Sequence, residues 1–451
     1  MSGRSIAPRV LAACATLFGV AHAAHAQNAW FTGLGDLPGG GTYSLALDIS
    51  RDGRHVAGSS DSGSGGFWDE PALWSDSGWE GLGFLPGGNR DGNAWGVSPE
   101  AGWVVGESGS AQGYQAFAWS RESGMFALGD LPGGDFRSTA YSVSRNGRVV
   151  VGKGTVSWNS QDASEAWRWT RTGGMQGLGT LPTTDQKPSS TAHGISADGS
   201  VIVGGSSITG GGVAFRWTES GGMIGLEDLP GGKMAGNAYA VSANGRWTVG
   251  FGDVEDDSGM RHREAALWNE QGGVVGLGFL TDDGGLSYHS IATGVSDNGR
   301  VVVGYADSDD YPSGDVAFLW TPENGLRPLT EVLLQDYGID VAAMGWGLVN
   351  ASAVTPDGRT IVGTGFIRGG GTQGWIVHLP DIPSPSTLPP LALAALLASR
   401  RRRASRPVQH PLLVADMDLD GFDDIITGDH GEDVGEASVS VLINQSFIIA
   451  P

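Results

Sequence analysis

A turn signature recurs seven times between residues 52 and 358, and it constrains the fold of this chain more than any other feature. Each copy places Asp-Gly or Asn-Gly, or the degenerate Glu100-Ala101-Gly102, between two short apolar runs. The turn glycines, at intervals of 45 to 59 residues, are Gly53, Gly102, Gly147, Gly199, Gly245, Gly299 and Gly358. Asn-Gly and Asp-Gly favour a two-residue type I′ turn, because both central residues need positive φ. The sequence therefore predicts seven β-hairpins.

Each hairpin belongs to a longer repeat that predicts four strands. The hairpin supplies strands a and b, a run of the type Ala-x-x-Trp supplies strand c, and Gly-Leu-Gly-x-Leu-Pro supplies strand d. Short runs rich in β-branched and aromatic residues between Gly, Pro, Asn or Asp are typical of β-strands. Units of roughly 40 to 50 residues with four strands each indicate blades of a β-propeller. The predicted fold is all-β, a seven-bladed β-propeller of four-stranded blades.

The two ends of the repeat region predict how the ring closes. Strand d is expected after the first six copies of strand c, at residues 82–85, 128–131, 178–181, 224–229, 277–280 and 326–329. No such run follows Trp375, whereas an unpaired copy at residues 34–40 precedes the first hairpin. We expect this N-terminal strand to pair beside Trp375, because that pairing completes the last blade and leaves no sheet edge open.

Residues 1–26 have the three parts of a secretory signal peptide. Two arginines, an apolar run at residues 10–20 and Ala24-His25-Ala26 follow one another. The apolar run is too short for an ordinary membrane span. The chain is therefore expected to be exported, and to be extracellular or associated with the cell surface. Cys14 is the only cysteine and lies in this segment, so the cleaved protein would contain no disulfide; a lipoprotein cleavage box at Cys14 is the alternative.

The formal net charge of -22 argues against a nucleic-acid partner, because phosphates would be repelled. The acidity has two interpretations: solubility outside the cell, or cation binding by acidic loops. The expected partner is an unknown extracellular ligand, for which a glycan and a surface protein are candidates.

The long connections between strands b and c are the predicted working surface, because variable loops on a rigid scaffold usually carry binding. They span residues 59–70, 154–165, 253–264 and 305–315. Aromatic residues in these connections are candidates for ligand contact: Trp68, Tyr114, Trp158, Tyr305 and Tyr311. The tryptophans of strand c recur at one position in each blade, so packing between blades is expected of Trp74, Trp119, Trp169, Trp217, Trp268 and Trp320.

No local catalytic motif is present, and no catalytic residue is assigned. His262 and His289 lie near carboxylates in the sequence, but there is no His-Glu-x-x-His spacing and no Gly-x-Ser-x-Gly elbow. A structural or ligand-binding module is therefore the first hypothesis. The alternative is a secreted propeller glycoside hydrolase or polysaccharide lyase that gathers carboxylates from different blades.

The repeat as a whole resembles a known family. Gly-Leu-Gly-x-Leu-Pro-Gly-Gly, Ala-x-x-Val-Ser-x-[Asp/Asn]-Gly-Arg-x-Val-Gly and Ala-Phe-x-Trp together are similar to the bacterial extracellular HAF-repeat family over residues 33–380. Ala214 to Trp217 and Ala317 to Trp320 are the best copies of the last element. The resemblance implies an exported, propeller-forming protein, here residues 27–380, and assigns no activity.

Composition changes at residue 381. A Pro-rich stretch is followed by the apolar residues 391–398 and by Arg400 to Arg403. Residues 383–403 resemble a PEP-CTERM sorting tail, although Ser384 stands where Glu is usual and the stretch is not terminal. This implies transient contact with the membrane or the sorting machinery; a linker helix is the alternative for residues 381–403.

The tail, residues 404–451, carries the clearest metal motif. Asp416, Asp418, Asp420 and Asp424 place carboxylates at positions 1, 3, 5 and 9, with a glycine at position 6 and the carbonyl of Phe422 at position 7. Calcium takes six to eight oxygen ligands, and this spacing can wrap them around one ion. Thr427 at position 12 argues against an EF-hand. Residues 412–444 resemble a single FG-GAP or VCBS-type repeat, which implies that these residues hold Ca²⁺.

The orientation of this tail is open. If residues 391–398 anchored the chain with the arginines inside, the calcium loop would lie in the cytoplasm or be removed during sorting. A plain acidic turn is the other interpretation of the aspartates.

Overall fold

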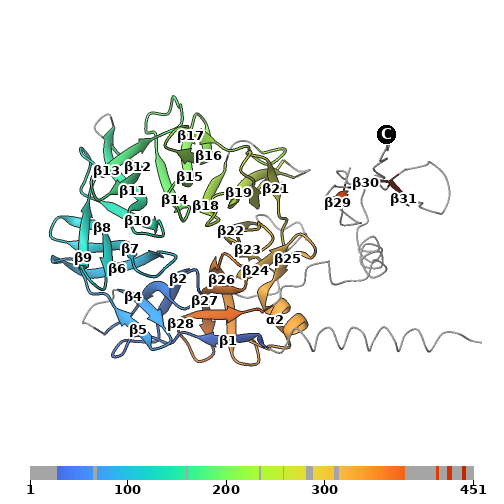
Figure 1. Cartoon of the computed structure of the whole chain (residues 1–451), viewed down its shortest axis with the longest axis horizontal. Helices are drawn as coiled ribbons and strands as arrows, with labels where there is room; N and C mark the ends of the chain where they lie inside the picture. Colours follow the sequence, from blue (N-terminus) through green and yellow to red (C-terminus); the bar gives the residue numbers. More distant parts are fainter. Residues whose placement is uncertain are drawn as a thin grey trace, which may run out of the picture. The chain divides into compact units, whose positions relative to one another are not determined.

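The computed structural model describes residues 28–63, 69–158, 161–232, 235–256, 259–280, 288–308 and 314–380, and the backbone of three strands between residues 413 and 442. The chain divides into two compact units, residues 1–382 and 383–451. The first unit holds seven four-stranded antiparallel sheets arranged in a ring (Figure 1). The predicted seven-bladed β-propeller is confirmed.

The strands of the seven blades, from the centre outward, follow the order a, b, c and d. Blade 1 contains β2 (Ser44–Ile49), β3 (Val56–Ser60), β4 (Glu70–Ser75) and β5 (Gly78–Gly81). Blade 2 contains β6 (Gly87–Val97), β7 (Val104–Ser110), β8 (Gly113–Ser120) and β9 (Gly124–Gly129). Blade 3 contains β10 (Ser138–Val143), β11 (Val149–Trp158), β12 (Gln161–Thr170) and β13 (Gly174–Gly179). Blade 4 contains β14 (Ser190–Ile195), β15 (Val201–Ile208), β16 (Gly211–Thr218) and β17 (Gly222–Gly225).

Blades 5 to 7 repeat the arrangement. Blade 5 contains β18 (Asn237–Val241), β19 (Thr248–Glu255), β20 (Arg261–Trp268) and β21 (Val274–Gly276). Blade 6 contains β22 (Ser290–Val295), β23 (Val302–Asp307), β24 (Asp315–Thr321) and β25 (Gly325–Pro328). Blade 7 contains β26 (Trp346–Val354), β27 (Thr360–Ile367), β28 (Thr372–His378) and, from the other end of the chain, β1 (Trp30–Gly33).

The N-terminal strand closes the ring as predicted, but it begins earlier than expected. β1 pairs with β28 with Gly33 opposite Trp375, and Leu34 contributes one last hydrogen bond, from its N–H to the carbonyl of Gly374 at 2.9 Å. The other d strands also lie a few residues before their predicted positions. The reason is that the leucines of the Leu-Pro segments, such as Leu82 and Leu85, are buried between blades instead of standing in the outer ladder.

The a–b hairpins form, but the predicted type I′ geometry is wrong. In blade 1 the N–H of Gly53 donates to the carbonyl of Ser50 (3.0 Å) and the N–H of Ser50 donates to the carbonyl of His55 (2.9 Å). The loop therefore has four residues, and Gly53 alone takes positive φ, at 72°. Asp52 is selected for another reason: its Oδ1 accepts hydrogen bonds from the Ser50 hydroxyl and the Arg54 N–H. Short polar side chains commonly satisfy turns in this way.

The degenerate turn of blade 2 uses a different residue from the predicted Gly102. The N–H of Ala101 donates to the carbonyl of Ser98 at 2.7 Å, which is the bond that the turn glycine makes elsewhere. Ala101 has φ of 54° and is the only non-glycine residue with positive φ in the described part of the chain. Left-handed conformations are unfavourable for residues with a Cβ, so this turn is strained.

In five of the seven blades, a glycine in strand b lies opposite an aromatic ring from strand c. Phe117, Trp167, Phe215, Phe318 and Trp375 are fully buried, and each lies opposite such a glycine. Four of them stand two residues before a predicted packing tryptophan. The tryptophans still pack: Trp119 and Trp268 are buried, and the half-buried ones, Trp74, Trp169, Trp217 and Trp320, lie against the apolar clusters between blades.

Buried serines at the start of strand a join neighbouring blades. The Ser190 hydroxyl accepts the N–H of Ala166 (2.9 Å) and donates to the carbonyl of Gly179 (2.6 Å). Ser44, Ser138 and Ser290 make the same two kinds of bond. Each serine satisfies two backbone groups that burial would otherwise leave unpaired.

Among the described residues of the propeller, one helix interrupts the β structure. The predicted sixth strand d runs into α2 (Leu329–Tyr337), which ends at Gly338 in the left-handed conformation. Leu329, Val332 and Leu333 are buried in the cluster shared with β24, β26 and β28. The spacing of these residues fits a helix, so residues 326–329 divide between strand β25 and this helix.

The second unit contains a three-stranded antiparallel sheet of β29 (Leu413–Ala415), β30 (Asp424–Gly428) and β31 (Val439–Leu442). Ala415 lies opposite Asp424. The signal-like residues 1–26 and the sorting-like residues 383–403 lie outside the described residues. In the described part of the chain, no helix is long and apolar enough to cross a membrane.

Candidate functional site

A β-bulge at the same place in every inner strand presents one extra side chain to the central channel. The pairing register of strands a and b skips one residue after the buried alanine in each blade. All seven skipped residues line the channel: Leu47, Trp95, Tyr141, His193, Tyr239, Thr293 and Ser352. Bulges often re-aim side chains next to functional sites.

These residues surround a cavity of about 440 Å³. Its other walls include residues of the a–b turns, among them Arg51, Pro99, Ala197 and Pro356. The cavity therefore extends to the a–b side of the ring, which is not the side predicted to carry binding. Strands b and c also extend into the predicted b–c loops, as in blade 3, where residues 149–158 pair with residues 161–170.

Four neighbouring bulge residues form an aromatic arc: Trp95, Tyr141, His193 and Tyr239. Ring centroids are 5.8 Å apart for Trp95 and Tyr141, 5.2 Å for Tyr141 and His193, and 5.1 Å for His193 and Tyr239. The arc covers blades 2 to 5, whereas blades 6, 7 and 1 present smaller side chains at this position. The channel therefore has an aromatic wall on one side and a wall of smaller side chains on the other.

The histidine of the aromatic arc carries no charge near pH 7. Burial, with the positive charge of Lys153, lowers the pKa of His193 to about 4, so its imidazole is uncharged. Burial raises the pKa of Tyr239. Burial also raises the pKa of Tyr305, which completes this side of the cavity, to about 12, with Tyr239 and Asp315 adding to the effect.

Asp48 is the only carboxylate among the described residues that line the cavity. Its two oxygens accept the N–H groups of Ile49 (2.8 Å) and of Val97 in the next blade (2.9 Å). Burial raises its pKa to about 6, against the opposing effect of these two hydrogen bonds. Asp48 therefore places a single negative charge at the blade 1 edge of the cavity at neutral pH.

The seven bulge residues of the channel were not predicted, although the sequence contains a signal for them. Strand a repeats as Ala-x-x-[Val/Ile]-[Ser/Thr] in all seven blades, and the first x is the bulge residue. The second x is small in six blades and is Asp48 in the first. Variation at one position inside an otherwise regular repeat marks the side chain that leaves the core.

Of the predicted aromatic contacts, Tyr305 lines the cavity. Tyr114 lies away from it, and its hydroxyl donates to Asp91. Trp158 belongs to β11, but its side chain is not described, and Trp68 and Tyr311 lie outside the described residues. Asp416, Asp418, Asp420 and Phe422 also lie outside them, and Asp424 is described only as the first residue of β30.

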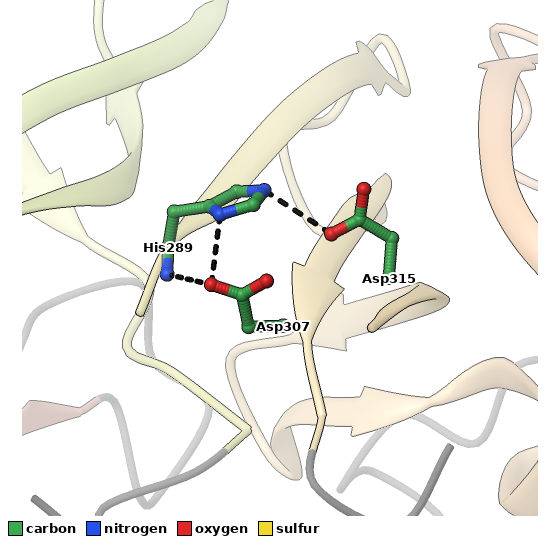
Figure 2. Close-up of side chains that lie close together, drawn as sticks. All are labelled: His289, Asp307 and Asp315. Carbon is green, nitrogen blue, oxygen red and sulfur yellow. Dashed lines mark hydrogen bonds and ion pairs between the residues drawn. The ribbon is translucent and has the colours of Figure 1, made fainter. Parts of the chain in front are cut away.

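The two histidines near carboxylates have different surroundings. His262 is buried and stacked on Tyr288, with centroids 3.8 Å apart, and its Nε2 lies 3.0 Å from Asp256. His289 lies between two carboxylates, with Nδ1 2.8 Å from Asp307 and Nε2 3.3 Å from Asp315 (Figure 2). Within the described residues, this is the one cluster of three side chains whose ligand atoms lie within 4.8 Å of one another.

These features define the class: a closed seven-bladed β-propeller with a pocket in its channel. No family model matches the sequence, and no curated protein matches it. Similar solved structures include TolB from Acinetobacter baumannii, with 15% identity and a TM-score of 0.39 over 60% of this chain and 62% of that one. An oligogalacturonate lyase from Vibrio parahaemolyticus has 10% identity and a TM-score of 0.47, over 79% and 95%. The Dos1 propeller has 9% identity and a TM-score of 0.39, over 75% and 80%. Such likeness concerns the fold alone.

Proposed function

We propose that this chain is an exported, cell-surface-associated β-propeller that acts as a structural or ligand-binding module, with its ligand in the central channel. The aromatic arc on the cavity wall carries this proposal. Concave sites lined by aromatic side chains with a few polar groups are where proteins usually bind small molecules and chain ends. A sugar ring fits this chemistry, since it can stack on the arc while its hydroxyl groups donate to Asp48.

The number of carboxylates in the cavity wall favours a binding function over the alternative, a glycoside hydrolase. The usual glycosidase mechanism needs two carboxyl groups, about 5 to 9.5 Å apart, on either side of the bond that is cleaved. Asp48 is the single carboxylate among the described residues of the cavity wall. A polysaccharide lyase has no specific observation in its favour.

Export and surface association rest on the sequence. The signal-like residues 1–26 and the resemblance of residues 33–380 to exported HAF-repeat proteins both support them. Residues 383–403 are proposed to contact the membrane or the sorting machinery. The partner is proposed to be an extracellular glycan or surface protein, and the net charge of -22 opposes nucleic acid.

The calcium motif belongs to the same proposal. Asp416, Asp418, Asp420, Asp424 and the carbonyl of Phe422 would hold one Ca²⁺. The pairing of Ala415 with Asp424 supports this, because it brings together the two ends of the segment that carries the motif. Replacing Asp416 and Asp420 together with Asn should abolish calorimetric Ca²⁺ binding to the full chain; unchanged binding would refute the assignment.

The channel proposal is tested by a glycan array with the purified full chain, followed by calorimetry on each hit. Tyr141→Ala and Tyr239→Ala should each weaken binding about tenfold or more, since an aromatic contact contributes about 0.5–1.5 kcal/mol beyond its buried area. Trp30→Ala is the control, because Trp30 is an exposed aromatic residue of the outermost strand.

Three outcomes are informative. Binding that falls only in the channel variants supports the proposal. Binding that persists in both channel variants refutes the channel as the site. Release of shortened sugars by the wild-type chain would replace the binding function with a catalytic one.

A further inference from the structure

The backbone brings three residue positions together on the b–c side of several blades. The first precedes strand a, the second lies at the end of strand b, and the third lies at the start of strand c. In blade 6 the N–H of Asp307 donates to the carbonyl of His289 at 2.9 Å. The same bond joins Asp61 to Tyr43, Thr155 to Arg137 and Ser207 to Ser189. The position is therefore a property of the fold, and these four blades fill it with different side chains.

Blade 6 fills these positions with His289, Asp307 and Asp315. Asp307 and Asp315 lie directly opposite each other on β23 and β24, and His289 precedes β22. The three side chains are 28% to 36% exposed, so the cluster is accessible without being fully solvated. In Figure 2 the second oxygen of Asp307 points toward Asp315, below the imidazole ring.

Hydrogen bonding alone leaves this cluster poorly balanced. Like charges directly opposite on paired strands are destabilising. A neutral imidazole has only one N–H, yet both ring nitrogens of His289 face a carboxylate oxygen. A cation between the two carboxylates would relieve this repulsion.

We propose that His289, Asp307 and Asp315 bind one divalent first-row transition-metal ion, with Zn²⁺ as the reference ion. One imidazole and two carboxylates form a mixed nitrogen and oxygen set, which suits such metals, whereas Ca²⁺ and Mg²⁺ prefer oxygen alone. The backbone N–H of His289 donates to Asp307 Oδ2 at 2.8 Å, and the same oxygen lies 2.8 Å from Nδ1, which fixes Asp307 beside the ring. Nε2, which lies 3.3 Å from Asp315, is the ring nitrogen left for the metal.

The proposal is independent of the channel and of the calcium motif. It concerns the b–c side of blade 6, and its residues do not line the cavity. Blade 1 supplies a natural comparison. Tyr43 and Asp61 are joined by the same backbone bond, and Asp69, one residue before β4, is near the start of strand c, as Asp315 is in blade 6. That site has two carboxylates but no imidazole.

The test is a calorimetric titration of the metal-stripped full chain with Zn²⁺, in excess Ca²⁺ so that oxygen-only sites are filled. The wild-type chain should bind one equivalent tightly and gain thermal stability, because a ligand that binds only the folded state stabilises it. His289→Ala and Asp315→Asn should each weaken this binding tenfold or more. Two variants are the controls. His55→Ala removes a histidine that lies beside a single carboxylate, and Asp61→Asn removes the carboxylate at the equivalent position of blade 1, which has no histidine.

Circular dichroism of each metal-free variant shows whether it is folded. A second measurement needs no variant: Zn²⁺ should protect His289 of the wild-type chain from diethylpyrocarbonate, read by peptide mass spectrometry, while His55 continues to react. Loss confined to the blade 6 variants, with protection of His289, supports the site. Binding that survives His289→Ala, that falls equally in the controls, or that leaves His289 reactive overturns it.

Discussion

The Cα of Gly204 lies so close to the carbonyl oxygen of Thr191 that a Cβ on Gly204 would fall 1.9 Å from that oxygen. The corresponding glycines of the other six blades approach strand a in the same way, at 1.8 to 2.0 Å: Gly58, Gly106, Gly152, Gly250, Gly304 and Gly363. In five blades the ring of a buried aromatic residue lies on this glycine as well. The Val-Gly of the repeat is therefore required by the bulged inner strand.

Gly204→Ala is expected to destabilise the propeller by about 4 kcal/mol or to prevent folding, because the colliding atom is a buried backbone carbonyl that cannot move aside. Gly212→Ala in the same blade is the control. A Cβ there would meet its nearest atom at 3.8 Å, so the change should cost less than about 1 kcal/mol. Urea unfolding of the two variants measures the difference, and equal stabilities would contradict the role assigned to Gly204.

Ala101→Gly is expected to stabilise the chain by about 0.5–1 kcal/mol. The change removes the left-handed strain of Ala101, offset in part by the greater entropy of glycine in the unfolded chain. Gly102→Ala is the comparison, since Gly102 has ordinary φ and open space around its Cα; it should be neutral or slightly stabilising. A loss of stability in Ala101→Gly would show that the turn strain is not relieved.

Phe31→Ala should destabilise the closed ring by about 3 kcal/mol, as expected when a large buried side chain is removed. Phe31 is 9% exposed and lies 5.4 Å, centroid to centroid, from Trp346. Trp30→Ala, one residue earlier in the same strand, should cost less than about 1 kcal/mol, because Trp30 is 44% exposed. Thermal unfolding of both variants tests whether β1 is part of the core; similar shifts would argue that it is not.

Asp48 should make the folded chain less stable as pH rises. Its folded pKa of about 6 exceeds the unfolded value near 3.8, so the native state binds more protons between these values and stability falls as pH passes through them. The expected loss from pH 4.5 to pH 7.5 is about 2 kcal/mol, at 1.36 kcal/mol for each pKa unit.

The Asp48→Ser variant isolates this effect from the other carboxylates. Serine is the residue that blade 3 carries at this position, Ser142. Relative to wild type, the variant should gain about 2 kcal/mol between pH 4.5 and pH 7.5, measured by urea midpoints at both pH values. A difference that does not change with pH would mean that Asp48 titrates normally.

The sequence alone determined the number of blades, the order of their strands and the closure of the ring. These properties follow from the repeat, because all seven copies carry the strand b glycine and six of them carry the Asp-Gly or Asn-Gly turn. The sequence predicted strand boundaries less reliably where side chains pack between blades. Leu82 and Leu85 stand in an apolar run that resembles a strand, yet they fill the space between blades 1 and 2. The turn type was wrong because Asp52 forms a side-chain hydrogen bond instead of taking positive φ.

The tertiary structure decided which residues could form a site. Tyr141 and Tyr239 come from different blades, and only closure of the ring places them on one wall with His193 between them. His289, Asp307 and Asp315 meet because a backbone bond draws the start of strand a to the end of strand b. The repeated residues determine the local geometry of each blade. The residues of a site stand at positions that vary from blade to blade, so only the packing of the blades shows which of them lie together.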